Sequence, residues 1–129
     1  MQHRPHLKPA TKLISSLALI SGLALAMSGP ALGAGDAAAG ARAWAEEHKP
    51  ADGSAPRSCS TCHTTDLTKT GKHATTGKAI EPMAVSVNPK RLTDQAKVEK
   101  WLGRNCRWTL GRDCTPEEKG NFVAFIKSK

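Results

Sequence analysis

Helical periodicity organises three separate stretches of this chain. Residues 36–48 are rich in alanine and begin with an aspartate that is placed to cap a helix. From residue 94 to about residue 104, apolar residues recur three and four positions apart, again after an aspartate. The last stretch, 115–127, opens with a threonine cap, a proline in the first turn and a glutamate that completes a capping box. The pattern predicts an all-α fold with three main helices and connecting loops.

The first and last of these helices carry faces that fit one another. Gly40 and Trp44 stand four residues apart, so a second helix can approach closely over the glycine while the indole packs beside it. Phe122, Phe125 and Ile126 form the apolar face of the last helix. We therefore expect the last helix to pack on the Gly40 and Trp44 side of the first.

The segments between the helices are polar or interrupted by proline. Residues 49–58 contain two prolines and a glycine and are expected to form a loop. Residues 64–76 are rich in threonine and are expected to be irregular; His73 in this segment is better interpreted as an exposed loop histidine than as a metal ligand. Residues 80–89 are moderately apolar with two prolines, which predicts an extended segment rather than a helix.

One short motif carries the clearest chemistry. Residues 59–63 read Cys-Ser-Thr-Cys-His, the pattern through which c-type haem is attached. Each cysteine can add its sulfur across one haem vinyl group, and His63 can place an imidazole nitrogen on the iron. On one helical turn Cys59, Cys62 and His63 share a face, so all three can reach one macrocycle. The motif predicts one covalently attached haem c with His63 as proximal ligand, and loop order suggests that the Pro82 carbonyl orients its ring.

Two other interpretations of the motif are weaker. A zinc site built from Cys59, Cys62 and His63 would need one outside ligand, and adjacent cysteine and histidine are awkward for tetrahedral zinc. A thioredoxin-like redox pair would need a βαβ pattern around it, and the sequence shows none. Haem attachment therefore remains the favoured interpretation.

The second axial ligand has two candidates. Met83 could offer its thioether, or it could be adaptable core filler. Asn105 is the fourth member of the stripe formed with Val98, Trp101 and Leu102, and a buried amide must find a partner. Asn105 is therefore either the left-handed C-cap of its helix or a ligand that binds the iron through its side-chain oxygen.

Cys106 and Cys114 are the two cysteines that the motif does not use. In an oxidising compartment they should pair, and the closed loop would stabilise the fold by about 2.5 kcal/mol in the chain-entropy model. The disulfide would begin one residue after Asn105, and it could therefore fix the approach of that amide to the haem.

The N-terminus predicts export. A basic start leads into the uncharged run 13–27, followed by a Gly-Pro break and small residues. This is the pattern of a Sec-type signal peptide over residues 1–33, and its apolar core is too short for a membrane anchor. Cleavage after Gly33 would leave one small monohaem domain, residues 34–129, that is not embedded in the membrane.

Composition adds two constraints. Residues 34–129 contain only sixteen large apolar residues (Leu, Ile, Val, Met, Trp and Phe), so the core is thin, and a buried macrocycle would supply missing apolar mass. The formal net charge at pH 7 is +8 for the whole sequence and +5 for residues 34–129. A basic surface could suit an acidic electron donor, although ordinary solvation explains it as well. Export argues against a nucleic-acid partner.

Several longer stretches resemble one known family. They are residues 35–40, 88–94, 98–106 and 111–120. With these stretches and the haem motif in view, nearly the whole mature chain is similar to the SHP family, small oxygen-binding monohaem cytochromes c with an asparagine axial ligand. The resemblance implies a class I cytochrome c-like fold, with three main helices and loops wrapped around one covalent haem and the first and last helices crossing.

The resemblance also assigns roles to residues. It places the axial asparagine on Asn105 and the family disulfide on Cys106 and Cys114. A neutral amide oxygen is a hard, weak donor that suits ferric iron better than ferrous iron. Our hypothesis is that reduction releases Asn105 and opens a position for O₂, NO or CO. Met83 has no ligand role in that pattern, so the alternative is a conventional electron-transfer cytochrome c with His63 and Met83 on the iron.

Partners follow from the same resemblance. It implies a periplasmic protein that receives electrons from a dihaem c-type cytochrome, with a membrane cytochrome b upstream. It further implies possible turnover of O₂ or NO, which no residue of the sequence establishes. Enzymatic activity is therefore left open.

Overall fold

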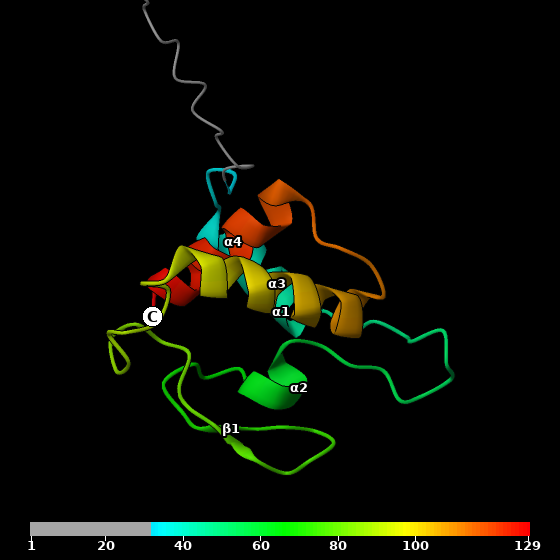
Figure 1. Cartoon of the computed structure of the whole chain (residues 1–129). Coiled ribbons are helices and arrows are strands. Elements are labelled where there is room, and N and C mark those ends of the chain that lie inside the picture. Colours follow the sequence, from blue (N-terminus) through cyan, green and yellow to red (C-terminus); the bar gives the residue numbers. More distant parts are fainter. Residues whose placement is uncertain (1–31) are drawn as a thin grey trace, which may run out of the picture.

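The structure is a computed structural model that describes residues 32–129. Within them, four helices and one short hairpin follow in order (Figure 1): α1 Ala37–Ala45, α2 Ser60–His63, β1 Gly71–Lys72, β2 Ala79–Ile80, α3 Gln95–Leu110 and α4 Pro116–Lys127. This confirms the all-α prediction, with the first helix shorter than expected at its C-terminus. The predicted signal peptide lies outside the described residues except for its last two positions.

The predicted crossing of the first and last helices is confirmed. A Cβ built on Gly40 would meet the carbonyl of Asn121 in α4 and would lie 2.8 Å from the Cβ of Phe125. Only glycine permits this approach. Trp44, one turn further along α1, packs edge-on against Phe122 and Phe125, with ring centroids 6.3 and 5.8 Å away. The α1 and α4 faces therefore form the centre of the core.

The other buried apolar residues extend this core toward the loops. Beside the aromatic residues of α1 and α4 it contains Leu67, Ala84, Cys106, Cys114 and Ile126. The backbone N–H groups of Met83 and Ala84 both donate to the Leu67 carbonyl, 2.9 Å each, which ties two loop segments together. The loops are thus part of the packed structure and hold defined positions around α2.

Both terminal helices begin where their capping residues predict. The Asp36 carboxylate accepts hydrogen bonds from the N–H groups of Ala38 and Ala39, 2.7 and 3.2 Å. At α4, Thr115 Oγ1 accepts from the Glu118 N–H at 3.2 Å while the Glu118 carboxylate accepts from the Thr115 N–H at 2.8 Å. The capping box read from the sequence is therefore present.

The middle helix is longer than predicted. α3 starts after Asp94, whose side chain accepts from the Lys97 N–H at 3.0 Å, as expected. It continues to Leu110 and ends at Gly111, which has φ 73°. Glycine adopts this left-handed conformation without the cost of a Cβ, so the helix ends there. The interpretation of Asn105 as a C-cap is wrong, because Asn105 lies inside the helix.

The segment after α2, predicted to be irregular, contains a small hairpin. β1 and β2 pair antiparallel, with Gly71 opposite Ile80. A Cβ on Gly71 would meet the carbonyl of Cys62 and would lie 3.1 Å from the Cα of His63. The absent side chain lets the hairpin approach α2 closely, a contact that threonine content alone could not reveal. The segment from residue 81 to residue 89 forms no helix, as predicted.

Candidate functional site

The site is built around the short helix α2. Cys59 occupies the N-cap position with helical backbone angles, and Ser60–His63 complete a single turn. Cys59 and Cys62 are free thiols, and both are half-buried. Buried Ser58 supports the start of the turn, because its N–H donates to Thr61 Oγ1 at 2.8 Å. The turn thus brings Cys59, Cys62 and His63 together, as the sequence predicts.

His63 lies in an apolar setting. Its ring centroid is 5.5 Å from that of Trp44, and Trp44 Nε1 donates to the carbonyl of Thr64 at 2.9 Å. His63 Nδ1 is buried and has no hydrogen-bond partner among the described residues. Burial, together with the nearby charge of Arg91, lowers the pKa of His63 to about 4. The imidazole is therefore neutral near pH 7, the form that binds a metal.

The prediction that the Pro82 carbonyl orients His63 is wrong. That carbonyl accepts instead from Arg91 Nε at 3.0 Å and from Asn88 Nδ2 at 3.3 Å. Arg91 also donates to the Glu81 carbonyl at 2.8 Å, so one guanidinium holds the extended segment in place. This role of Arg91 is not predictable from the sequence, in which its only signal is its place in the stretch 88–94.

The two alternative interpretations of the motif find no support. Among residues 32–129, no group of three histidine, cysteine or acidic side chains is placed to hold a metal ion. Burial, with a smaller effect of Cys62, raises the pKa of the Cys59 thiol to about 12. Redox-active dithiols instead need a lowered pKa. The raised pKa of Cys59 therefore argues against a thioredoxin-like role.

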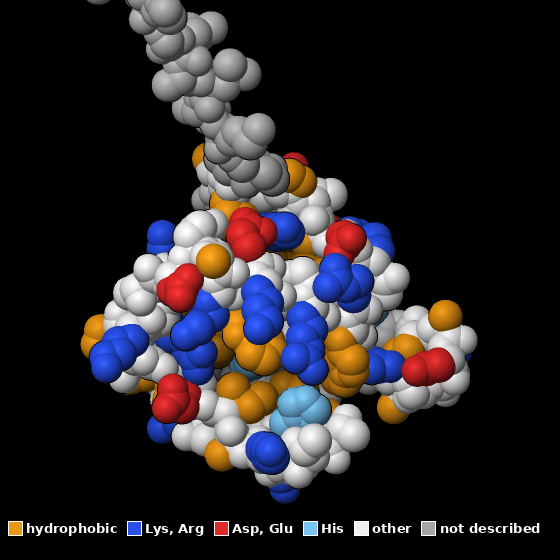
Figure 2. All heavy atoms as spheres, in the orientation of Figure 1, with side chains coloured by type: hydrophobic (Ala, Val, Ile, Leu, Met, Phe, Trp, Pro, Cys, Tyr) orange, Lys and Arg blue, Asp and Glu red, His pale blue; other side chains and the backbone are white. Residues whose placement is uncertain are grey.

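The α3 face that carries Asn105 is open to its surroundings. Trp101 is 46% exposed and Trp108 is 38% exposed, and Asn105 between them is exposed as well. Val98 and Leu102, from the same predicted stripe, are half-buried. Figure 2 shows apolar side chains lining a hollow just below the front of α3. The stripe expected to be buried by protein is thus covered on one side only.

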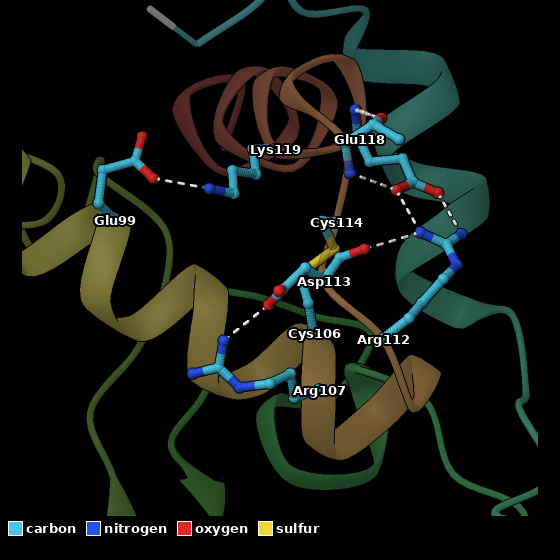
Figure 3. Close-up of a disulfide and its surroundings, with 9 residues drawn as sticks. Glu99, Cys106, Arg107, Arg112, Asp113, Cys114, Glu118 and Lys119 are labelled. Atoms are coloured by element: carbon cyan, nitrogen blue, oxygen red, sulfur yellow. Dashed lines mark hydrogen bonds and ion pairs between the residues drawn. A yellow bond between two sulfur atoms is a disulfide. The ribbon is translucent and has the colours of Figure 1, made fainter. Parts of the chain in front are cut away.

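The predicted disulfide is present and begins at the residue after Asn105. Cys106 and Cys114 are bonded, with their Cα atoms 5.6 Å apart, and both are buried (Figure 3). Ion pairs surround the bond: Arg107 with Asp113 at 2.6 Å, and Arg112 with Glu118 at 2.7 Å. The disulfide and these pairs fix the end of α3 against the start of α4.

A cation–π contact ties the segment just before α2 to α3. The guanidinium of Arg57 lies 4.3 Å from the ring centroid of Trp108, and the Arg57 side chain is only 14% exposed. Asp52 and Ser54 hold its far side, with Arg57 Nη2 donating to Ser54 Oγ at 2.6 Å. The stack connects the residue before Ser58 with the helix of Asn105, through a tertiary contact that local sequence patterns cannot reveal.

Two other candidate ligands have ordinary surroundings. Met83 is half-buried and packs against the core cluster. His73 is exposed on the hairpin, and its Nδ1 accepts from the N–H groups of Thr75 and Thr76 at 3.3 and 3.2 Å. Its place agrees with the interpretation of an exposed loop histidine.

These features fit a haem c group. Two free thiols lie on one turn, a neutral histidine beside them has a buried ring nitrogen without a partner, and the uncovered face of α3 offers two tryptophans and an amide. Cys59 and Cys62 would hold the porphyrin covalently, and His63 would bind its iron. Such a group adds the apolar mass that this small core lacks.

Comparison with known proteins gives the same assignment. A family model described as "Domain of unknown function (DUF1924)" matches residues 30–126. The cytochrome c-type protein SHP of Cereibacter sphaeroides is 53% identical over 72 residues, which are 56% of this chain and 55% of that protein. The match therefore spans about half the length of this curated relative.

Solved structures share the fold. The structure of oxidised SHP, an oxygen-binding cytochrome c, matches with a TM-score of 0.65 and 44% identity, covering 74% of this chain and 83% of that one. A solution structure of cytochrome c'' from Methylophilus methylotrophus, described in terms of haem-ligand detachment, matches with a TM-score of 0.64 and 37% identity, covering 73% and 75%. No helix among residues 32–129 is long and apolar enough to cross a membrane. The chain belongs to the DUF1924 family, and it is a c-type cytochrome with covalently bound haem c.

Proposed function

We propose that this cytochrome carries electrons and binds a diatomic gas, O₂, NO or CO, in its reduced state. His63 would bind the haem iron in both oxidation states, and the Asn105 amide oxygen would bind it in the oxidised protein and would be released on reduction. The haem supplies one-electron redox chemistry and an iron position for the gas.

The observation that carries this proposal is the setting of Asn105. Its side chain is exposed, and no hydrogen bond joins it to another described residue. Trp101 and Trp108, four residues before and three after, share its side of α3. An amide inside a helix, on an apolar face and without a protein partner, is free to serve as a ligand.

The chemistry of the amide explains why its bond would depend on oxidation state. A neutral carbonyl oxygen is a hard donor and holds ferric iron better than the softer ferrous iron. After release, the amide N–H₂ of Asn105 would remain close and could donate a hydrogen bond to an incoming gas. The disulfide one residue later anchors α3, so Asn105 can leave by rotation of its side chain without movement of the helix.

The comparisons support both parts of the proposal, the binding of a gas and the release of a haem ligand. SHP is described as an oxygen-binding cytochrome c, and cytochrome c'' is described in terms of haem-ligand detachment. Each of these properties belongs to that protein. Their joint appearance among structures at 37% to 44% identity makes a detachable ligand the first hypothesis to test in this chain.

Optical spectra of the matured protein test the proposal. Reduced wild type should be high-spin and should bind CO at once, and Asn105→Ala should change both the ferric spectrum and the rate of CO binding. Met83→Leu is the matched control, because it removes the competing thioether and should leave both unchanged. A reduced protein that stays low-spin and ignores CO, and whose ferric thioether band disappears in Met83→Leu, would establish the conventional carrier instead.

Location, partners and turnover belong to the same proposal. We infer that residues 1–33 direct the chain to the periplasm, where a dihaem c-type cytochrome, supplied by a membrane cytochrome b, reduces it. The mass of the mature protein from a periplasmic extract tests the cleavage after Gly33. Consumption of O₂ or NO by the reduced protein, followed at an electrode, tests whether gas binding leads to turnover.

A further inference from the structure

Three basic side chains form a row along the outer side of α3. Lys97, Lys100 and Arg104 are all exposed, and their spacing of three and four residues places them on one face of the helix. We call these three residues the α3 basic row. Figure 2 shows basic side chains gathered over this helix, above the apolar hollow.

The α3 basic row has no acidic partner of its own. The ion pairs among the described residues are Arg57–Asp52, Arg107–Asp113, Arg112–Glu118 and Lys119–Glu99. Glu99 lies within the same helix but is bonded to Lys119 of α4 at 2.8 Å. The Asp94 side chain caps the helix. The three cations therefore point outward without a balancing charge, while the cations beside the disulfide are neutralised.

An exposed tryptophan accompanies the row. The guanidinium carbon of Arg104 lies 5.4 Å from the ring centroid of Trp101, which is 46% exposed. From Lys97 to Arg104 the row is about 10 Å long, at 1.5 Å per helical residue. Trp101 belongs to the face that α3 offers to the haem group, so the row runs along the border of the haem site.

We propose that Lys97, Lys100 and Arg104 form the docking surface for an acidic redox protein. The inference rests on the proposed electron-transfer function and adds the place and the chemistry of the partner. Unpaired cations on one face attract an acidic surface over a distance of about 8 Å at physiological salt, and so raise the association rate. The row lies on the helix that carries Asn105, so a partner bound there lies next to the haem site.

Stopped-flow reduction of the ferric holoprotein tests the proposal, with reduced flavodoxin, an acidic flavoprotein, as the probe. The variant is the triple change Lys97→Gln, Lys100→Gln and Arg104→Gln. The control is Lys49→Gln, Lys69→Gln and Lys127→Gln, which removes the same charge from exposed sites elsewhere. The row variant should lose about tenfold in second-order rate at low ionic strength and should show a flatter salt dependence, whereas the control should change less than about twofold.

Three results would overturn the docking surface. Equal losses in both variants would mean that total charge alone steers the probe. An altered haem spectrum in the row variant, with an unchanged flavodoxin rate, would mean that the cations serve the haem carboxylates. Binding of wild type, but not of the row variant, to phosphatidylserine vesicles, again with an unchanged flavodoxin rate, would assign the row to a lipid surface.

Dithionite and CO distinguish the docking-surface proposal from the gas-binding function on which it rests. Both variants should be reduced by dithionite and should bind CO like wild type. If wild type itself fails to bind CO after reduction by dithionite, the proposed gas-binding function fails, whatever the flavodoxin rates show. If CO binding is normal and the row variant keeps its full rate with flavodoxin, only the docking surface fails.

Discussion

The crossing of α1 and α4 depends on the missing side chain of Gly40, and Gly40→Ala tests it. A Cβ at this position would meet the Asn121 carbonyl and would lie 2.8 Å from the Cβ of Phe125. The first neighbour is backbone, so no rotamer change can make room for it. The two helices would have to separate, and the packing of Trp44 against Phe125 would loosen with them.

Two effects of opposite sign set the size of the change. Replacing a helical glycine by alanine favours the helix by about 1 kcal/mol. Overpacking a core costs about 1–3 kcal/mol, and a clash with backbone belongs at the upper end of that range. Gly40→Ala should therefore destabilise the protein by about 2 kcal/mol. For a domain of this size that corresponds to a fall of roughly 10 °C in Tm.

Gly103→Ala is the matched control. It makes the same chemical change inside α3, where the nearest atom to a new Cβ is the flexible end of Arg107 at 3.6 Å. This variant should be more stable than wild type by up to about 1 kcal/mol. Thermal unfolding of both holoproteins, followed by far-UV circular dichroism, gives the comparison. If Gly40→Ala were stabilising to the same degree as Gly103→Ala, the close approach of α1 and α4 would be refuted.

Three further changes test other parts of the fold. Glu118→Gln should cost about 1–2 kcal/mol at pH 7, because the Glu118 carboxylate completes the α4 cap and binds Arg112. These contacts hold its pKa at about 2 against an ordinary 4.5, so the difference from wild type in urea unfolding should persist above pH 4.5 and vanish as the pH falls through about 2. Replacing Cys106 and Cys114 together by serine should lower the free energy of unfolding by about 2.5 kcal/mol in urea titration; an unchanged midpoint would contradict this. Trp44→Phe should cost about 1 kcal/mol, since its indole donates to a backbone carbonyl beside α2; a loss near zero in the same titration would show that water replaces the donor.

Local signals account for what the sequence predicted well. The caps at Asp36, Asp94 and Thr115 act through hydrogen bonds within a few residues, so residue type and spacing suffice to locate them. The approach over Gly40 could also be predicted, because a glycine one turn from Trp44 leaves a groove that any packed helix can fill. The attachment turn is the most local feature of all, since its three functional residues lie within five positions.

Contacts between distant segments account for what was missed. The carbonyl of Pro82 accepts a hydrogen bond from Arg91, and the Arg57 side chain stacks on Trp108, fifty-one positions away. The residue types of the two arginines do not predict these partners. The end of α3 was misplaced for a related reason. The amide at Asn105 was a plausible C-cap by residue type, but Gly111 offered the left-handed conformation at lower cost, so the helix continued.

The open side of α3 shows why an apolar stripe and a buried stripe are different predictions. Periodicity reports that a helix has an apolar side and says nothing of what covers it. In α3, Val98 and Leu102 lie on the half of the stripe nearer the core and are half-buried. No described residue covers Trp101 and Asn105, which are exposed. This uncovered tryptophan and amide face the turn that carries two thiols and an imidazole. We conclude that the haem group, and not a protein segment, completes the core on this side of α3. The apolar stripe of α3 alone therefore cannot show what covers it. The haem-attachment motif at residues 59–63 can, because it identifies the group that packs there.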